Sequence, residues 1–189
     1  MNTKNLALIG LMSAVLCILG PMSLPIPISP VPISLGMLGV YLTVYILGMK
    51  KGTISICIYI LLGTIGLPVF TAFGSGIGKV LGPTGGYLVG YIFIALIFGF
   101  FIDRWKTNQV LIFSGMILGT AACYLLGTAW LAKQAGMSFS AALAAGVIPF
   151  IPGDLAKIII TMLVGAPVRK ALWKAGILEV HSEQNVQMN

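Results

Sequence analysis

Charged residues are scarce in this sequence. Only 8% of its 189 residues are charged and 58% are hydrophobic, whereas an average soluble domain carries about 25% charged residues. Eleven basic and four acidic side chains cannot cover the surface of a 19.9 kDa globule, and the apolar remainder would aggregate in water. The composition therefore excludes a water-soluble enzyme or nucleic-acid-binding domain. With a mean hydropathy of +1.05, it predicts an integral membrane protein with one domain over residues 1–189.

Residues that commonly catalyse reactions or bind metals are also few. His181 is the only histidine and lies in the polar tail at 179–189. The three cysteines lie singly in apolar runs, without disulfide or zinc spacing. No Ser/His arrangement, H-E-x-x-H motif or pair of membrane aspartates is present, and Val80 occupies the Ser/Thr position that a Walker A motif requires after Gly78-Lys79. We therefore expect no catalytic residue, no metal and no cofactor.

Long uncharged runs predict the membrane helices. The first run, after Lys4, extends for 45 residues but contains five prolines within residues 21–32, which a continuous helix cannot accommodate. Glycine, proline and charged residues divide the rest of the chain. The sequence thus predicts an all-α fold of six transmembrane helices, with 21–32 as an extended loop. The expected helices are 6–20, 33–49, 53–67, 87–102, 110–131 and 154–168, with a short amphipathic helix at 138–147.

The basic residues predict the orientation of the chain. If the N-terminus is cytoplasmic, eight of the eleven basic residues lie on the cytoplasmic side and only Lys79 and Lys133 lie outside. This asymmetry follows the positive-inside rule and places both termini, with the polar tail, in the cytoplasm. The net charge of +7 then lies beside anionic headgroups of the lipid bilayer, so no nucleic-acid partner is expected. The eight residues are Lys4, Lys50, Lys51, Arg104, Lys106, Arg169, Lys170 and Lys174.

Two opposite charges mark the last predicted helix. Asp154 and Lys157 are three residues apart, so they share one helix face, and ionisable residues within a membrane span indicate a functional site by default. Such a pair offers an acceptor to ligand N–H groups and a cation to a carboxylate or carbonyl. The alternative is structural: the two charges neutralise each other, with Asp154 as the helix N-cap.

Small residues mark two further candidate sites. Gly85 and Gly86 precede Tyr87, where they either permit close approach of the backbone to a ligand or form a flexible turn. Gly10 and Ala14 form a small-x-x-x-small face in the first helix. That face serves either packing within the bundle or docking of a partner subunit.

The proline-rich loop is a fourth candidate site. It carries no charge and should be stiff, so Pro25, Pro27, Pro30 and Pro32 form either a lid over an external pocket or an inert connection. Rings of repeated polar residues, as in a channel, and two repeated halves, as in a secondary transporter, are not evident. A binding subunit that takes its energy from other chains fits these features best.

Three motifs occur together in the chain: G-P-T-G-G-Y-L at 82–88, P-V-P-I-S at 30–34 and P-G-D-x-x-K at 152–157. In this combination the sequence resembles the BioY family, the biotin-specific substrate-binding (S) components of energy-coupling-factor (ECF) ABC transporters. The resemblance implies the six-helix S-component fold and capture of biotin from outside. It also implies a transmembrane coupling (T) subunit and two ABC ATPase subunits as partners, and a location in a bacterial cell membrane.

The resemblance assigns roles to individual residues. It implies ligand contacts by Asp154, Lys157, Gly85, Gly86 and Tyr87, and contacts with the T subunit by Gly10 and Ala14. As walls for the rings and chain of biotin we nominate Tyr41, Tyr87, Tyr91 and Trp130. In this hypothesis Asp154 accepts hydrogen bonds from the ureido N–H groups. Lys157 either bonds the ureido oxygen or attracts the carboxylate, and the sequence leaves both possibilities open.

One position departs from the family. Gly36 stands where the family often has glutamine, so a polar contact from that position is absent or replaced. Two other functions also remain open from the residues alone. The chain could be an autonomous proton-coupled importer of a small carboxylate, or a membrane scaffold without a small ligand.

Overall fold

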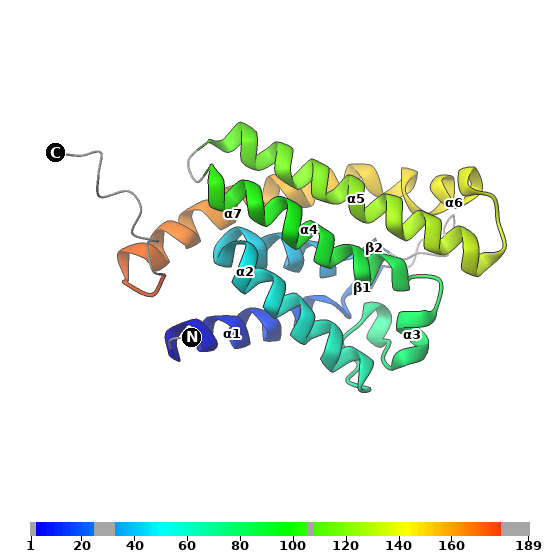
Figure 1. The fold of residues 1–189 in the computed structure, drawn as a ribbon, viewed down its shortest axis with the longest axis horizontal. Helices are drawn as coiled ribbons and strands as arrows, with labels where there is room; N and C mark the ends of the chain where they lie inside the picture. Colours follow the sequence, from blue (N-terminus) through cyan, green and yellow to red (C-terminus); the bar gives the residue numbers. More distant parts are fainter. Residues whose placement is uncertain (1–2, 25–32, 106–107, 179–189) are drawn as a thin grey trace.

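Most of the described chain is helical. The computed structural model describes residues 3–24, 33–105 and 108–178 (Figure 1). Its helices are α1 (Thr3–Leu19), α2 (Gly36–Thr64), α3 (Ile77–Leu81), α4 (Gly85–Arg104), α5 (Gln109–Ala135), α6 (Phe139–Gly146) and α7 (Ile151–Lys174). Two short strands, β1 (Ser23–Leu24) and β2 (Ile33–Ser34), pair in antiparallel fashion. Two 3₁₀ turns are η1 (Thr71–Phe73) and η2 (Ile148–Phe150). The predicted all-α class is confirmed.

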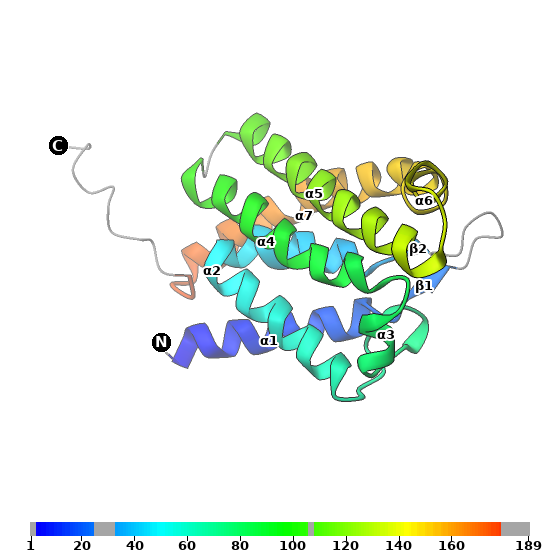
Figure 2. The ribbon, with the colours of Figure 1, turned by 45° about the vertical axis from the view of Figure 1, so that its right-hand side comes forward.

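The described residues contain four helical stretches that are long and apolar enough to cross a membrane, while α1 is a shorter apolar helix. The four stretches are Gly36–Thr64, Gly85–Arg104, Gln109–Ala135 and Phe139–Lys174. The chain is thus a multi-pass membrane protein. α1 begins and α7 ends at the same end of the bundle (Figures 1 and 2). Six crossings and a cytoplasmic location of both termini remain predictions.

Helix boundaries differ from the expected ones, and the differences in α2 and at the start of α7 matter most for the site. The predicted helices 33–49 and 53–67 both belong to α2, so the expected connection between them is helical, and the course of α2 is broken instead at Gly48. α7 begins at Ile151 rather than at 154. Pro152 therefore lies in the first turn of α7, where a missing backbone N–H costs nothing.

Glycines allow α4 and α5 to pack closely along their length. A Cβ atom on Gly90 would lie 3.0 Å from the Cα of Cys123, and one on Gly86 would lie 3.0 Å from the carbonyl oxygen of Leu126. The glycine spacing of α4 thus reflects contact between helices. Of the cysteines, Cys123 is fully buried in this contact, whereas Cys57 is exposed.

Two charged side chains bridge the break in α2. Gly48 has φ 77°, a left-handed value that favours glycine, and it separates segments 36–47 and 49–64. In an unbroken helix the N–H of Met49 would donate to the carbonyl of Tyr45. Here Met49 N donates to Asp103 Oδ2 at 2.9 Å, and Tyr45 O accepts from Arg169 Nη1 at 2.9 Å. The two bridging side chains, from α4 and α7, form an ion pair of 3.8 Å.

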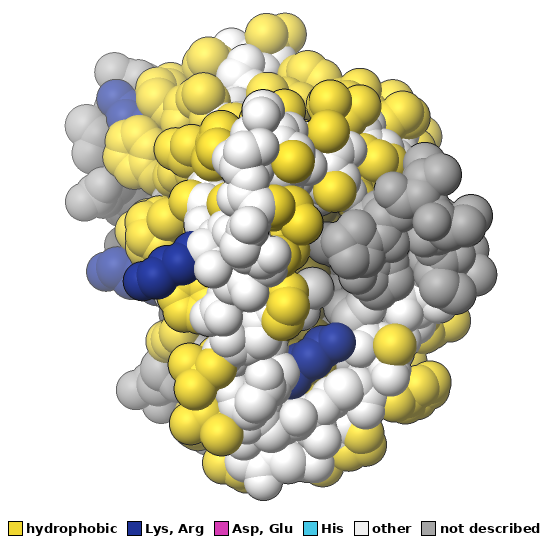
Figure 3. All heavy atoms as spheres, turned by 90° about the vertical axis from the view of Figure 1, so that its right-hand side faces the viewer, with side chains coloured by type: hydrophobic (Ala, Val, Ile, Leu, Met, Phe, Trp, Pro, Cys, Tyr) yellow, Lys and Arg dark blue, Asp and Glu magenta, His cyan; other side chains and the backbone are white. Residues whose placement is uncertain are grey.

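Three helices, α1, α4 and α7, pack against α2. On the far side of α4 lies α5, and α6 packs against α5. The short elements α3, α6, β1 and β2 gather at the end of the bundle opposite the start of α1 (Figures 1 and 2). Viewed at this end, hydrophobic side chains cover much of the surface, basic side chains are isolated, and no acidic side chain of a described residue is visible (Figure 3). The candidate site opens here.

Candidate ligand-binding site

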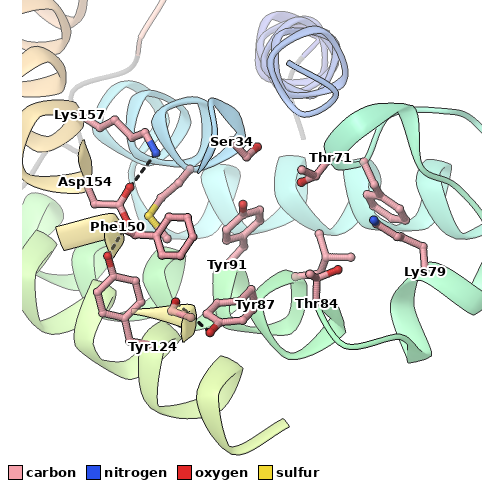
Figure 4. A pocket seen from close by; sticks show the side chains of 14 residues that line it. Ser34, Thr71, Lys79, Thr84, Tyr87, Tyr91, Tyr124, Phe150, Asp154 and Lys157 are labelled. Carbon is pink, nitrogen blue, oxygen red and sulfur yellow. Dashed lines mark hydrogen bonds and ion pairs between the residues drawn. The ribbon is translucent and has the colours of Figure 1, made fainter. Parts of the chain in front are cut away.

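A cavity opens between α2, α4, α5 and α7 at this end of the bundle. Its empty space amounts to about 620 Å³ when the solvent in its open mouth is included. Polar and apolar side chains both line it (Figure 4). The polar lining residues are Ser34, Thr71, Lys79, Thr84, Tyr87, Tyr91, Tyr124, Asp154 and Lys157, and the others are Met37, Phe70, Leu88, Gly146 and Phe150.

The predicted charge pair lies in the wall of this cavity. Lys157 Nζ donates to Asp154 Oδ1 at 2.7 Å, and the two residues are only 7% and 5% exposed. The hydroxyl of Tyr124 donates to Asp154 Oδ2. Both carboxylate oxygens therefore have a hydrogen-bond partner. Because the Asp154–Lys157 pair carries no net charge, the free-energy cost of burying it inside a membrane is lowered.

The alternative role of Asp154 as an N-cap is wrong. It is the fourth residue of α7, whose N-cap position is held by Phe150, and no side chain caps this helix. Instead, a spacing of one helical turn places Asp154 and Lys157 on one face of α7, and the structure directs that face to the cavity (Figure 4). The two charges do neutralise each other through their ion pair. The role of the pair in ligand binding stays a prediction.

Two predicted tyrosines of α4 also reach the cavity. Tyr87 donates its hydroxyl to the carbonyl of Gly146 at 3.0 Å, which ties α4 to the end of α6. The side chain of Tyr91 extends into the space between the charge pair and Thr84 (Figure 4). Its hydroxyl has no hydrogen bond within the described part of the chain, so it is available to a ligand.

Other predicted ligand residues lie behind the wall. Tyr41 is fully buried, and its hydroxyl lies 2.5 Å from Thr120 Oγ1. Trp130 donates its indole N–H to the carbonyl of Gly82 at 2.9 Å and packs over Gly86. Gly85 is buried at the start of α4 beside the same indole. The structure therefore places these predicted residues in support of the wall and not among its lining.

The predicted lid prolines, Pro25, Pro27, Pro30 and Pro32, lie outside the described residues. The strands on either side of them, β1 and β2, pair through Ser23 and Ser34. Of these two residues, Ser34 lines the cavity. Ser34 Oγ also accepts from the N–H of Gly36 at 2.9 Å, which brings a hydroxyl beside the position where the family often has glutamine.

Sequence reasoning missed several lining residues. Tyr124 lies in a long apolar helix without a motif, and only its contact with Asp154 identifies it. Thr84 is part of the G-P-T-G-G stretch, which could have indicated it. Lys79 was considered only as one of the basic residues that set the orientation of the chain in the membrane. Among the described residues, no three His, Cys, Asp or Glu side chains are grouped to hold a metal.

Comparisons with known proteins agree on one family. The model of the BioY family matches residues 1–174. A biotin transporter BioY of Rhizobium etli is 36% identical over 178 residues, which cover 89% of this chain and 94% of that protein. A biotin transporter BioY of Thermotoga maritima is 35% identical over 145 residues, which cover 77% of this chain and 85% of that protein. A crystal structure of the S-component for biotin from an ECF-type ABC transporter is similar with a TM-score of 0.83 and 33% identity, covering 90% of this chain and 95% of that one.

Proposed function

Because the chain belongs to the BioY family, of transporter S components and not of enzymes, we propose that it captures biotin. In this proposal it binds biotin from outside a bacterial cell membrane and delivers it inward with a T subunit and two ABC ATPase subunits. The observation that carries the proposal is the buried Asp154–Lys157 pair, which lies in the wall of a cavity with both polar and apolar lining residues. Transporters named for biotin among the relatives supply the identity of the ligand.

The site has free bonding capacity for a ureido ring. Asp154 uses one lone pair on each oxygen for Lys157 and Tyr124, so each oxygen can still accept a ligand N–H. Lys157 uses one of its three N–H donors. The thiophane ring and chain of biotin would pack against Met37, Leu88 and Phe150, with the rings of the cavity tyrosines, which matches the apolar walls and few polar groups typical of such sites.

The supporting residues would hold this wall in place. Trp130 fastens the turn before α4 to α5 through Gly82, and Tyr41 joins α2 to α5 through Thr120. Close packing at Gly85 and Gly86 sets the position of Tyr87 at the start of α4. We propose that the segment of Pro25, Pro27, Pro30 and Pro32 closes over bound biotin, since its flanking strands lie at the rim.

The docking face for the T subunit would be the outer side of α1. Gly10 and Ala14 are both exposed, and no atom lies within 4 Å of a Cβ placed on Gly10. The inner side of α1 is held to α2, where Ser13 donates to the carbonyl of Ser55 at 3.2 Å. A small-residue face that the bundle does not use lets a partner helix approach closely.

A pair of variants tests capture and docking together. We expect the unchanged, isolated protein to bind biotin below micromolar concentration by equilibrium titration. Gly10→Leu and Ala14→Leu should bind biotin equally well, because they lie far from the cavity lining, but should fail to copurify with the T subunit. Ala129→Leu, at an exposed position of α5, is the matched control, because it adds the same bulk on a different helix. No binding by the unchanged protein would refute biotin capture, and intact assembly of both leucine variants would refute the docking face.

A further inference from the structure

Two lysines line the cavity, and their electrostatic situations differ. Lys157 is neutralised by Asp154 at 2.7 Å. Lys79 has no acidic partner: of the two acids in the described residues, the other, Asp103, is paired with Arg169. The remaining two acids of the sequence are in the polar tail at 179–189. Among the described residues, Lys79 is therefore the cation of the cavity without an acidic partner.

The fold directs this charge toward the ligand space. The aliphatic stem of Lys79, in α3, passes over Gly74, since a Cβ placed on Gly74 would lie 3.0 Å from Lys79 Cε. A larger residue at Gly74 would push the stem away. Lys79 lies on the opposite side of the cavity from Asp154. Between them lie Thr84, Tyr87 and Tyr91 (Figure 4). The cavity thus has a neutral polar end and a cationic end.

We propose that Lys79 binds the carboxylate of the ligand, while the Asp154–Lys157 pair binds its uncharged polar end. This inference rests on the proposed function and fixes the direction in which biotin lies. A carboxylate placed against Lys157 would also lie against the charge of Asp154, and the repulsion is strong where water is largely excluded. Beside Lys79 the carboxylate would instead compensate a charge that has no other partner.

This orientation makes Lys79 a specificity-determining residue. The neutral end accepts and donates hydrogen bonds and so selects for the ureido group, whereas Lys79 selects for a negative charge at a set distance from it. A ligand with the same ring system but an uncharged tail would keep its contacts with the Asp154–Lys157 pair and lose its contact with Lys79. A loss of discrimination between biotin and its methyl ester in a Lys79 variant therefore reports on this contact.

The test is a titration of Lys79→Gln with biotin and with biotin methyl ester. Because a hydrogen bond to a charged group is worth about 10- to 100-fold in affinity, we expect the variant to lose roughly that factor for biotin and less than about 3-fold for the ester. Lys79→Arg should retain most of the affinity for biotin, since it keeps the charge. Lys133→Gln, the other predicted external lysine, should bind both compounds as the unchanged protein does.

Two outcomes would overturn the inference while leaving biotin capture intact. One is tight biotin binding by Lys79→Gln, and the other is an equal loss for biotin and the ester. If the unchanged protein binds no biotin, the proposed function fails and the inference fails with it. Melting temperatures of the variants in detergent separate a lost contact from a lost fold, and Lys79→Arg gives a second, charge-conserving measurement.

Discussion

Replacing Asp154 with asparagine should weaken biotin binding by about 100-fold, or about 3 kcal/mol. The change removes a charged acceptor for ligand N–H groups and leaves Lys157 as a buried cation without a counter-charge. The carboxamide keeps the shape of the side chain, so the cavity should keep its volume. Isothermal titration of the purified variant measures the effect directly.

Tyr124→Phe is the matched control for this prediction. It removes the hydroxyl that donates to Asp154 but leaves the charge pair in place, so the loss of affinity should be smaller, about 10-fold or less. If Asp154→Asn binds biotin normally and only melts at a lower temperature, the charge pair is a structural feature and the binding role assigned to it is wrong.

Arg169→Gln should lower the stability of the protein by about 2–3 kcal/mol, without changing biotin affinity. Arg169 satisfies the carbonyl of Tyr45, which the break at Gly48 deprives of its helical partner, and it compensates Asp103. Glutamine removes the charge and leaves a buried carbonyl without its donor. We expect the melting temperature in detergent to fall by roughly 4–10 °C.

Lys170→Gln is the control for that change, because Lys170 is the neighbouring cation and is exposed. Its removal should leave the melting temperature within the error of the measurement. An equal melting temperature for Arg169→Gln and the unchanged protein would show that the break in α2 needs no side-chain support from α7. A large loss of biotin affinity in Arg169→Gln would contradict its assignment to the fold alone.

The charge pair could be predicted because its physical basis is visible in the sequence. Asp154 and Lys157 stand in an otherwise uncharged run, and a spacing of three fixes their common face before any tertiary contact is known. Tyr87 and Tyr91 share a face of α4 for the same reason. The long apolar runs likewise predicted the helices, with errors mainly at glycine and proline positions.

The directions of other side chains could not be predicted in this way. Tyr41 and Trp130 are aromatic residues in apolar helices, and only their contacts with Thr120 and Gly82 show that they lie behind the wall instead of lining it. Lys79 reaches the cavity because Gly74 leaves room for its stem, a contact between α3 and the turn that precedes it. The break in α2 depends on two charges from other helices, which no local pattern reveals.

The ligand that remains bound during purification tests the central claim most directly. Native mass spectrometry of the protein, purified in mild detergent from cells grown with biotin, should show one bound molecule with the mass of biotin. The bound mass should disappear in Asp154→Asn prepared in parallel. A different retained small molecule in the unchanged protein, or an unliganded protein that also fails to take up added biotin, would contradict the account.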